Sequence, residues 1–77
     1  MSEEERRKFL LEQLEWVKDR QRIYDEIDRK LREMRGIAEI AAREAVSDAE
    51  REVLQEQMNE LRDEVEKLNA QLCQSVH

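Results

Sequence analysis

Apolar residues recur every three or four positions through the first half of the chain, the 3.5-residue repeat of helices that pack as coiled coils. Opposite charges spaced four residues apart accompany the stripe and stabilise a helix. One gap interrupts the stripe, at Arg20 and Gln21. The pattern predicts a first helix over residues 3–45. Its stripe consists of Leu10, Leu14, Val17, Tyr24, Ile27, Leu31, Met34, Ala38, Ala41 and Ala45.

A second stripe runs through the C-terminal part of the chain, out of phase with the first. The step from Ala45 to Leu54 does not fit an alternation of three and four residues. The break contains Ser47-Asp48-Ala49-Glu50, the pattern of a capping box that starts a helix. We therefore expect a turn at 46–48 and a second helix at 48–74, folded back antiparallel; a continuous helix with a stutter is the alternative. The second stripe is Leu54, Met58, Leu61, Val65, Leu68 and Leu72.

The first helix has more apolar surface than the second helix can cover. A further apolar line runs beside its stripe, whereas the second helix has a narrow seam only. The stripe residues from Tyr24 to Ala45 and the whole second stripe are assigned to the intrachain seam. Residues near the N-terminus project beyond the folded-back helix, so they are assigned with the extra line to an oligomer or partner interface. That interface comprises Phe9, Leu10, Leu11, Leu14, Trp16, Val17, Ile23 and Ile37.

The predicted fold class is all-α: residues 1–77 form one antiparallel coiled-coil hairpin, which dimerises into a helical bundle. Composition agrees, because 44% of the residues are charged, Pro is absent and Gly occurs once. The net charge of −6 argues against nucleic acid or an anionic membrane as partner. Residues 1–46 carry 12 acids and 11 bases, whereas residues 47–77 carry 8 acids and 3 bases. Two C-terminal segments should therefore repel each other.

The sequence indicates neither an enzyme nor a cofactor or metal protein. Cys73 and His77 are four residues apart and could share a helix face, but zinc sites need three or four ligands. A two-helix hairpin offers no cleft to desolvate a general acid or base, and the sequence contains no Gly-rich phosphate loop. No apolar run reaches the ~20 residues of a membrane span. The single cysteine fits a reducing compartment.

The segment LREMRGIAEIAAREAVSDAEREVLQEQMNELRDEVEKL, residues 31–68, resembles the N-terminal part of the core domain of bacterial flagellins. Flagellins have a helix with a Met-Arg pair and small residues, then a short polar loop and a second heptad helix. The resemblance implies a helical hairpin that packs against further coiled-coil helices. It covers about half the chain. The matching positions are Leu31, Met34, Arg35, Ile37, Ala38, Ala41, Ala42, Ser47, Asp48, Gln55, Met58, Leu61, Glu64 and Val65.

The chain also departs from flagellin at particular positions. Gly36 stands where flagellins have Glu, and the filament-completing C-terminal helix is missing. The innate-immune receptor for flagellin reads positions that here hold Glu33 and Gln57, so receptor recognition is not implied. The resemblance implies a bacterial protein that is cytoplasmic, or exported by a flagellar-type route without a cleaved signal.

A weaker resemblance, in size and two-helix shape, is to the short helical-hairpin regulators that bind phosphorylated response regulators. Their Ser-Gln-x-Leu-Asp signature is not present here; the nearest stretch begins at Leu54-Gln55. The favoured function is therefore a non-enzymatic, flagellin-like structural protein for self-assembly or protein–protein interaction. The alternative is a small regulatory module that acts on a signalling protein.

Overall fold

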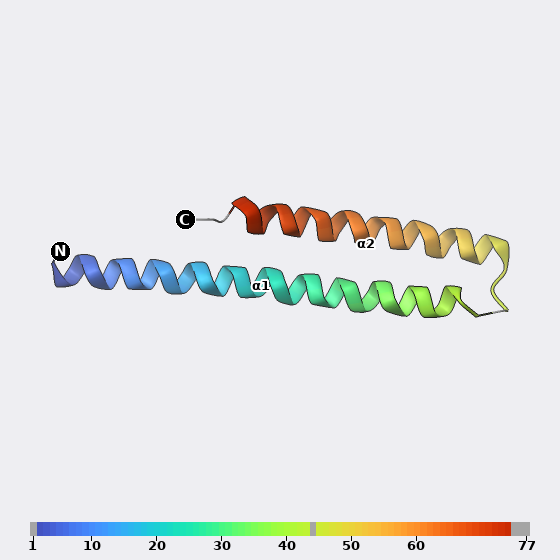
Figure 1. Cartoon of the computed structure of the whole chain (residues 1–77), viewed down its shortest axis with the longest axis horizontal. Coiled ribbons are helices and arrows are strands. Elements are labelled where there is room, and N and C mark those ends of the chain that lie inside the picture. The colour runs from blue at the N-terminus through green and yellow to red at the C-terminus, as the bar shows by residue number, and fades with distance from the viewer. Residues whose placement is uncertain (1, 44, 75–77) are drawn as a thin grey trace.

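The chain forms two antiparallel helices joined by a short connection (Figure 1). The computed structural model describes residues 2–43 and 45–74. Helix α1 is Glu3–Ala41 and helix α2 is Asp48–Gln74. The Cα trace measures 67 × 16 × 11 Å, so the molecule is a rod two helices thick. This architecture confirms the predicted all-α helical hairpin.

A serine caps the start of each helix: Ser47, as the capping-box pattern predicts, and Ser2 before α1. The Glu5 amide donates to Ser2 Oγ and the Glu50 amide donates to Ser47 Oγ, each over 3.2 Å. Each serine thereby satisfies one of the N-terminal amides that lack a partner inside the helix. Acidic side chains in both first turns complement the positive end of the helix dipole.

Helix α1 ends at Ala41, whereas the sequence predicts residue 45. The Ala42 amide still donates to the Ala38 carbonyl, and the Arg43 amide turns to the Ile40 carbonyl. Neither Gly nor Pro marks the end of this helix, so the apolar spacing alone predicts a helix that is too long. Val46 is half-buried in the connection, and Ala45, assigned to the seam, is exposed there. The hairpin needs these residues to span the ~8–10 Å between packed helix axes.

The α2 face of the seam is the predicted stripe. Leu61, near the middle of α2, is buried with 9% of its surface exposed. The other five members of the stripe are half-buried, namely Leu54, Met58, Val65, Leu68 and Leu72. Two-helix packing leaves one side of each seam residue near solvent, so the α2 stripe forms one half of a narrow apolar seam.

The α1 face of the seam is rotated relative to the prediction. Ile27, Met34 and Ala41 are half-buried as predicted, whereas Tyr24, Leu31 and Ala38 are exposed. Ile23 and Ile37, assigned to an interface with another molecule, are half-buried in their place. One line of half-buried positions steps by three and four residues, and Glu26 and Gly36 beside it are half-buried too; the line is Gln13, Trp16, Arg20, Ile23, Ile27, Lys30, Met34, Ile37 and Ala41. The seam assignment of Tyr24, Leu31, Ala38 and Ala45 is therefore corrected.

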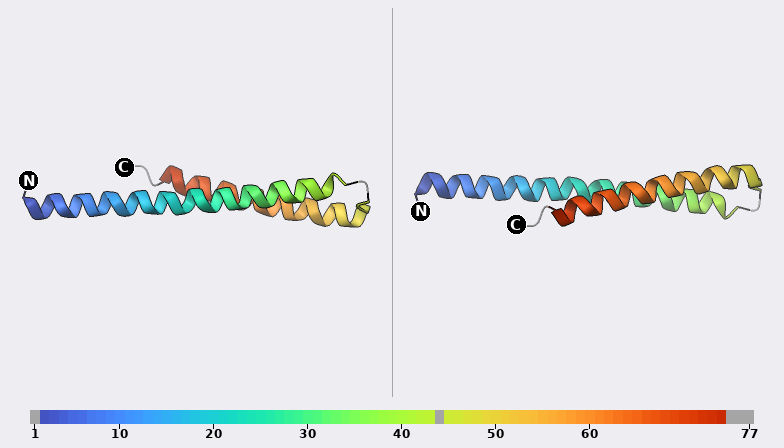
Figure 2. Two further views of the ribbon diagram at one scale, coloured as in Figure 1. Left: turned by 90° about the horizontal axis from the view of Figure 1, so that it is seen from below. Right: turned by 90° about the horizontal axis from the view of Figure 1, so that it is seen from above.

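Two contacts between the helices fix their register. Lys30 Nζ lies 2.7 Å from Glu64 Oε2, and Arg20 Nη1 lies 3.2 Å from the Leu72 carbonyl oxygen. These pairs show which residues of the two helices lie opposite each other. Gln74, at the end of α2, lies near Asp19 of α1, since both line one surface depression. Figure 2 shows the helices crossing at a shallow angle, as in a coiled coil.

Gly36 is half-buried on α1 at a position where a side chain has room. A Cβ built there meets nothing within 4 Å, and its φ is not positive. A close helix contact therefore does not explain this glycine. Because Gly costs a helix interior ~0.5–1 kcal/mol relative to Ala, Gly36→Ala should stabilise the protein by about that amount. Urea unfolding followed by circular dichroism measures the gain; an unchanged or lower midpoint would contradict it.

Candidate interaction surface

Residues 3–17 of α1 extend beyond the end of α2 (Figure 1). We call this segment the overhang; at ~1.5 Å per residue it is ~22 Å long. It carries the densest apolar surface among the described residues. Five large side chains are exposed by 47–59%: Phe9, Leu10, Leu11, Leu14 and Val17. All five belong to the predicted interface.

Trp16, Arg20 and Tyr24 form a junction where the overhang meets the end of α2. The Arg20 guanidinium lies 4.9 Å from the Trp16 ring centroid and 5.7 Å from that of Tyr24. It also donates to Tyr24 Oη over 3.2 Å and to the Leu72 carbonyl over 3.2 Å. The last turn of α2 has no basic residue of its own. Arg20 therefore supplies, from α1, the positive charge that favours a helix C-terminus.

The Arg20 contacts predict a specific loss on substitution. Arg20→Met keeps much of the aliphatic volume but removes the donor to the Leu72 carbonyl and the charge over the Trp16 ring. We expect ~1 kcal/mol of destabilisation, the usual worth of one such hydrogen bond. Amide hydrogen exchange should quicken most in the last turn of α2. Arg22→Met, which loses only an exposed pair with Asp19, is the control. Equal effects of the two substitutions would contradict the capping role.

Lys30 is a second cation in the α1 seam. Its ammonium bridges the helices by pairing with Glu64 at 2.7 Å and with Glu26 of its own helix at 3.4 Å. Its side chain is 19% exposed, whereas that of Glu64 is 47% exposed. The hydrogen bond to Glu64, and secondly that to Glu26, raise the pKa of Lys30 above its usual value, against the lowering effect of burial. A charged residue in a seam fixes register, because a shifted pairing leaves it without its partner.

This raised pKa predicts a loss of stability at alkaline pH. The folded pKa of Lys30 exceeds the unfolded one, so the pair stabilises the hairpin fully below the ordinary value of 10.5. The stabilisation should disappear as pH rises through the raised folded pKa. The unfolding midpoint should therefore fall more steeply above pH 10.5 in the unaltered chain than in Lys30→Met. Parallel pH curves for the two proteins would contradict the prediction.

One side of α1 next to the seam is apolar along its length. Five exposed residues at intervals of seven lie above one another there: Leu10, Val17, Tyr24, Leu31 and Ala38. We call this line the apolar edge. Each member from Tyr24 onward follows a seam residue by four positions, so the edge is continuous with the seam. The line on the other side of the seam is Glu12, Asp19, Glu26, Glu33 and Ile40, which is acidic up to Glu33.

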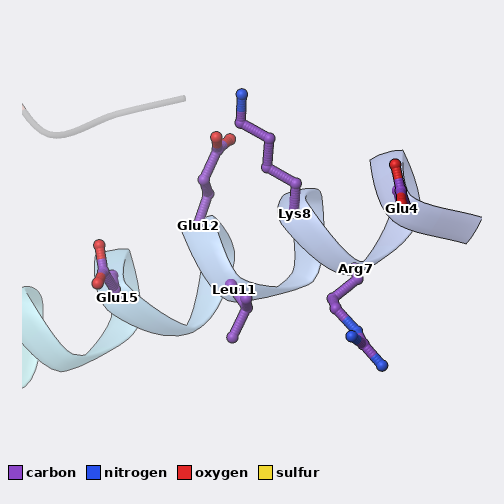
Figure 3. Close-up of a pocket in the computed structure, with 6 residues that line it drawn as sticks. All are labelled: Glu4, Arg7, Lys8, Leu11, Glu12 and Glu15. Atoms are coloured by element: carbon purple, nitrogen blue, oxygen red, sulfur yellow. The ribbon is translucent and has the colours of Figure 1, made fainter.

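The surface of the overhang holds a shallow depression whose walls belong to one helix. Figure 3 shows Lys8 and Glu12 pointing to the opposite side of α1 from Leu11. The six lining residues are Glu4, Arg7, Lys8, Leu11, Glu12 and Glu15. Within residues 2–43 and 45–74, no three His, Cys, Asp or Glu side chains are grouped to hold a metal ion. Cys73 is exposed on α2, and His77 lies outside the described residues.

The surface so described is exposed, apolar and built on a single long helix. No family model, curated protein or solved structure matches this chain. The apolar edge and the overhang are therefore the candidate interaction surfaces of the described residues. Neither described helix has an apolar stretch long enough to cross a membrane.

Proposed function

We propose that the chain is a non-enzymatic, flagellin-like helical-hairpin protein that self-assembles, most favourably as a dimer, by packing its overhang against other helices. The overhang is the observation that carries the proposal. Its five large side chains are 47–59% exposed, so burial of the remainder would gain roughly half of the ~1.5–3 kcal/mol that full burial of each contributes. A lone hairpin with one buried leucine is also marginal as a free monomer.

Charge supports helices as partners over nucleic acid or anionic lipid. The chain has a net charge of −6, and eight of its acids but three of its bases lie in residues 47–77. The overhang belongs to the nearly neutral part, so association there separates the acidic segments. This arrangement favours contact through α1 over contact through α2.

Sedimentation equilibrium tests the self-association. The intact chain should exceed its monomer mass of 9.3 kDa at micromolar concentration and approach twice that mass. A mass of 9.3 kDa up to ~100 µM, the range of weak complexes, would contradict the proposal.

The flagellin-like part of the proposal has a separate test. Residues 31–68 carry the motif, and within them the hairpin has one seam and an open edge. A peptide with the sequence of a flagellin C-terminal core helix should bind and raise the helical signal above the sum of the components. No binding at ~100 µM would reduce the resemblance to shared heptad chemistry.

A further inference from the structure

The apolar edge extends well beyond the overhang, onto the part of α1 that α2 already covers on another side. Tyr24 and Leu31 are 53% and 48% exposed although both lie within the paired part of the hairpin. The neighbouring line of α2, which faces the same side, holds Gln55, Arg62 and Asn69. This side of the hairpin thus has an apolar row on α1 beside a row on α2 that carries one charge at Arg62 and one at Asp48, where α2 begins.

A second copy of this chain fits such an edge. Two nearly uncharged edges can face each other despite the net charge of −6, whereas the acidic lines remain in solvent on the outside. The edge also adjoins the existing seam, so pairing would extend one apolar core across both hairpins. An anionic or strongly charged partner has no counterpart charges along this row.

A line of α1 residues flanks the apolar edge on the side away from the seam. The charges on this line favour one direction of packing. That neighbouring line consists of Arg7, Leu14, Gln21, Asp28 and Arg35. A parallel, in-register pair of α1 helices would place Asp28 against its own copy and Arg35 against its own copy. An antiparallel pair centred on Tyr24 places Asp28 near Gln21 and Arg35 near Leu14. Only the antiparallel arrangement avoids like-charge contacts, which are destabilising.

The length of α1 allows an extended interface in the antiparallel direction. In a parallel pair the two overhangs lie together, beyond the ends of both α2 helices. In the antiparallel pair, residues 3–17 of each copy lie beside the end of α1 nearest the turn in the other. The α1 helices then overlap by ~50 Å; at a helix width of ~10 Å this covers roughly 500 Å² on each copy. The total of roughly 1,000 Å² reaches the lower range of specific interfaces.

We propose that the apolar edge of α1 packs antiparallel against the same edge of a second copy, about a two-fold axis beside Tyr24. The inference rests on the self-association proposed above and specifies its geometry. In this arrangement the most exposed large side chain of the edge, Leu10, meets the small side chain of Ala38. The pairs across the axis are Leu10 with Ala38, Val17 with Leu31, and Tyr24 with its own copy.

Disulfide cross-linking of single-cysteine variants tests the geometry in the full chain. The background is Cys73→Ser, which removes the exposed native thiol. Tyr24→Cys should form a covalent dimer under mild oxidation, roughly tenfold faster than its neighbour Asp25→Cys, because disulfides need Cα atoms within ~7 Å. Leu10→Cys alone should not cross-link, but a mixture with Ala38→Cys should give the heterodimer, identified by mass spectrometry. Val17→Cys mixed with Leu31→Cys repeats the test without altering Tyr24.

The outcomes separate this geometry from self-association itself. If Leu10→Cys cross-links to itself as fast as Tyr24→Cys, the packing is parallel and the inference is overturned. If the Cys73→Ser chain sediments as a dimer but neither mixed pair forms heterodimers, the edge is not the interface, although self-association stands. If that chain sediments as a monomer, both proposals fail. Circular dichroism of each variant verifies that the helices are retained.

Discussion

Leu14→Asp combined with Val17→Asp is expected to convert the protein to a monomer. Both side chains lie in the overhang and are 50% and 47% exposed in the single chain. If they are buried between copies, each substitution removes roughly half of the ~1.5–3 kcal/mol that full burial of such a side chain contributes, and Val17→Asp would also place a carboxylate against an apolar side chain of the other copy. The combined loss should weaken association by more than ~100-fold. Helicity should fall too, because an unpacked helical segment of ~15 residues is marginal in water.

Sedimentation equilibrium and circular dichroism at the same concentration measure both effects. Lys8→Asp is the matched control, because it also lies in the overhang and changes the net charge by the same two units as the double variant. Lys8 belongs to the charged side that points away from Leu11. The control should therefore keep the mass of the unaltered chain. Equal behaviour of control and double variant would show that charge, not the apolar surface, governs association.

Leu61→Ala is expected to cost the most stability of any single truncation on α2. Leu61 is the most deeply buried side chain among the described residues, with 9% exposed. Leu-to-Ala changes in cores cost ~2–5 kcal/mol, through lost transfer energy and the cavity that remains. Because the other residues of the α2 stripe are only half-buried, they contribute too little stability to compensate for this loss. The urea midpoint should fall sharply, and a substantial unfolded fraction should appear without denaturant.

Val53→Ala is the matched control for Leu61→Ala. Val53 lies on the same helix, is 53% exposed and is outside the seam. Surface substitutions usually change stability by less than ~0.5 kcal/mol, and Ala has the higher helix propensity. The control midpoint should stay close to that of the unaltered chain or rise slightly. A Leu61→Ala midpoint equal to that of Val53→Ala would mean that the seam does not stabilise the fold.

The sequence predicts those features that depend on local chemistry. Ser47 marks the start of α2 because capping involves residues three positions apart. The α2 seam follows from one clear stripe with no competing line. The end of α1 was not predicted correctly, because Ala41 is followed by residues that continue the apolar spacing without Gly or Pro.

The α1 seam was predicted one line away from its actual position for a different reason. The half-buried line of α1 includes Arg20 and Lys30, and a search for apolar residues alone leaves these two out. Their partners, the Leu72 carbonyl and Glu64, lie 52 and 34 residues away along the chain. Polar groups can occupy a seam when such partners are in reach, but the register that brings them together is a tertiary property. For the same reason, the apolar pattern assigns Ile23 and Ile37 to an interface with another molecule and not to the intrachain seam.

The concentration dependence of unfolding tests most directly whether the overhang is buried by self-association. If folding and association are coupled, raising the protein concentration from 1 to 100 µM should stabilise the folded state by ~2.7 kcal/mol, and the urea midpoint should rise accordingly. Leu14→Asp with Val17→Asp should show no such rise. A midpoint of the unaltered chain that stays constant over this range would contradict the account, because the hairpin would then be stable with its overhang in water.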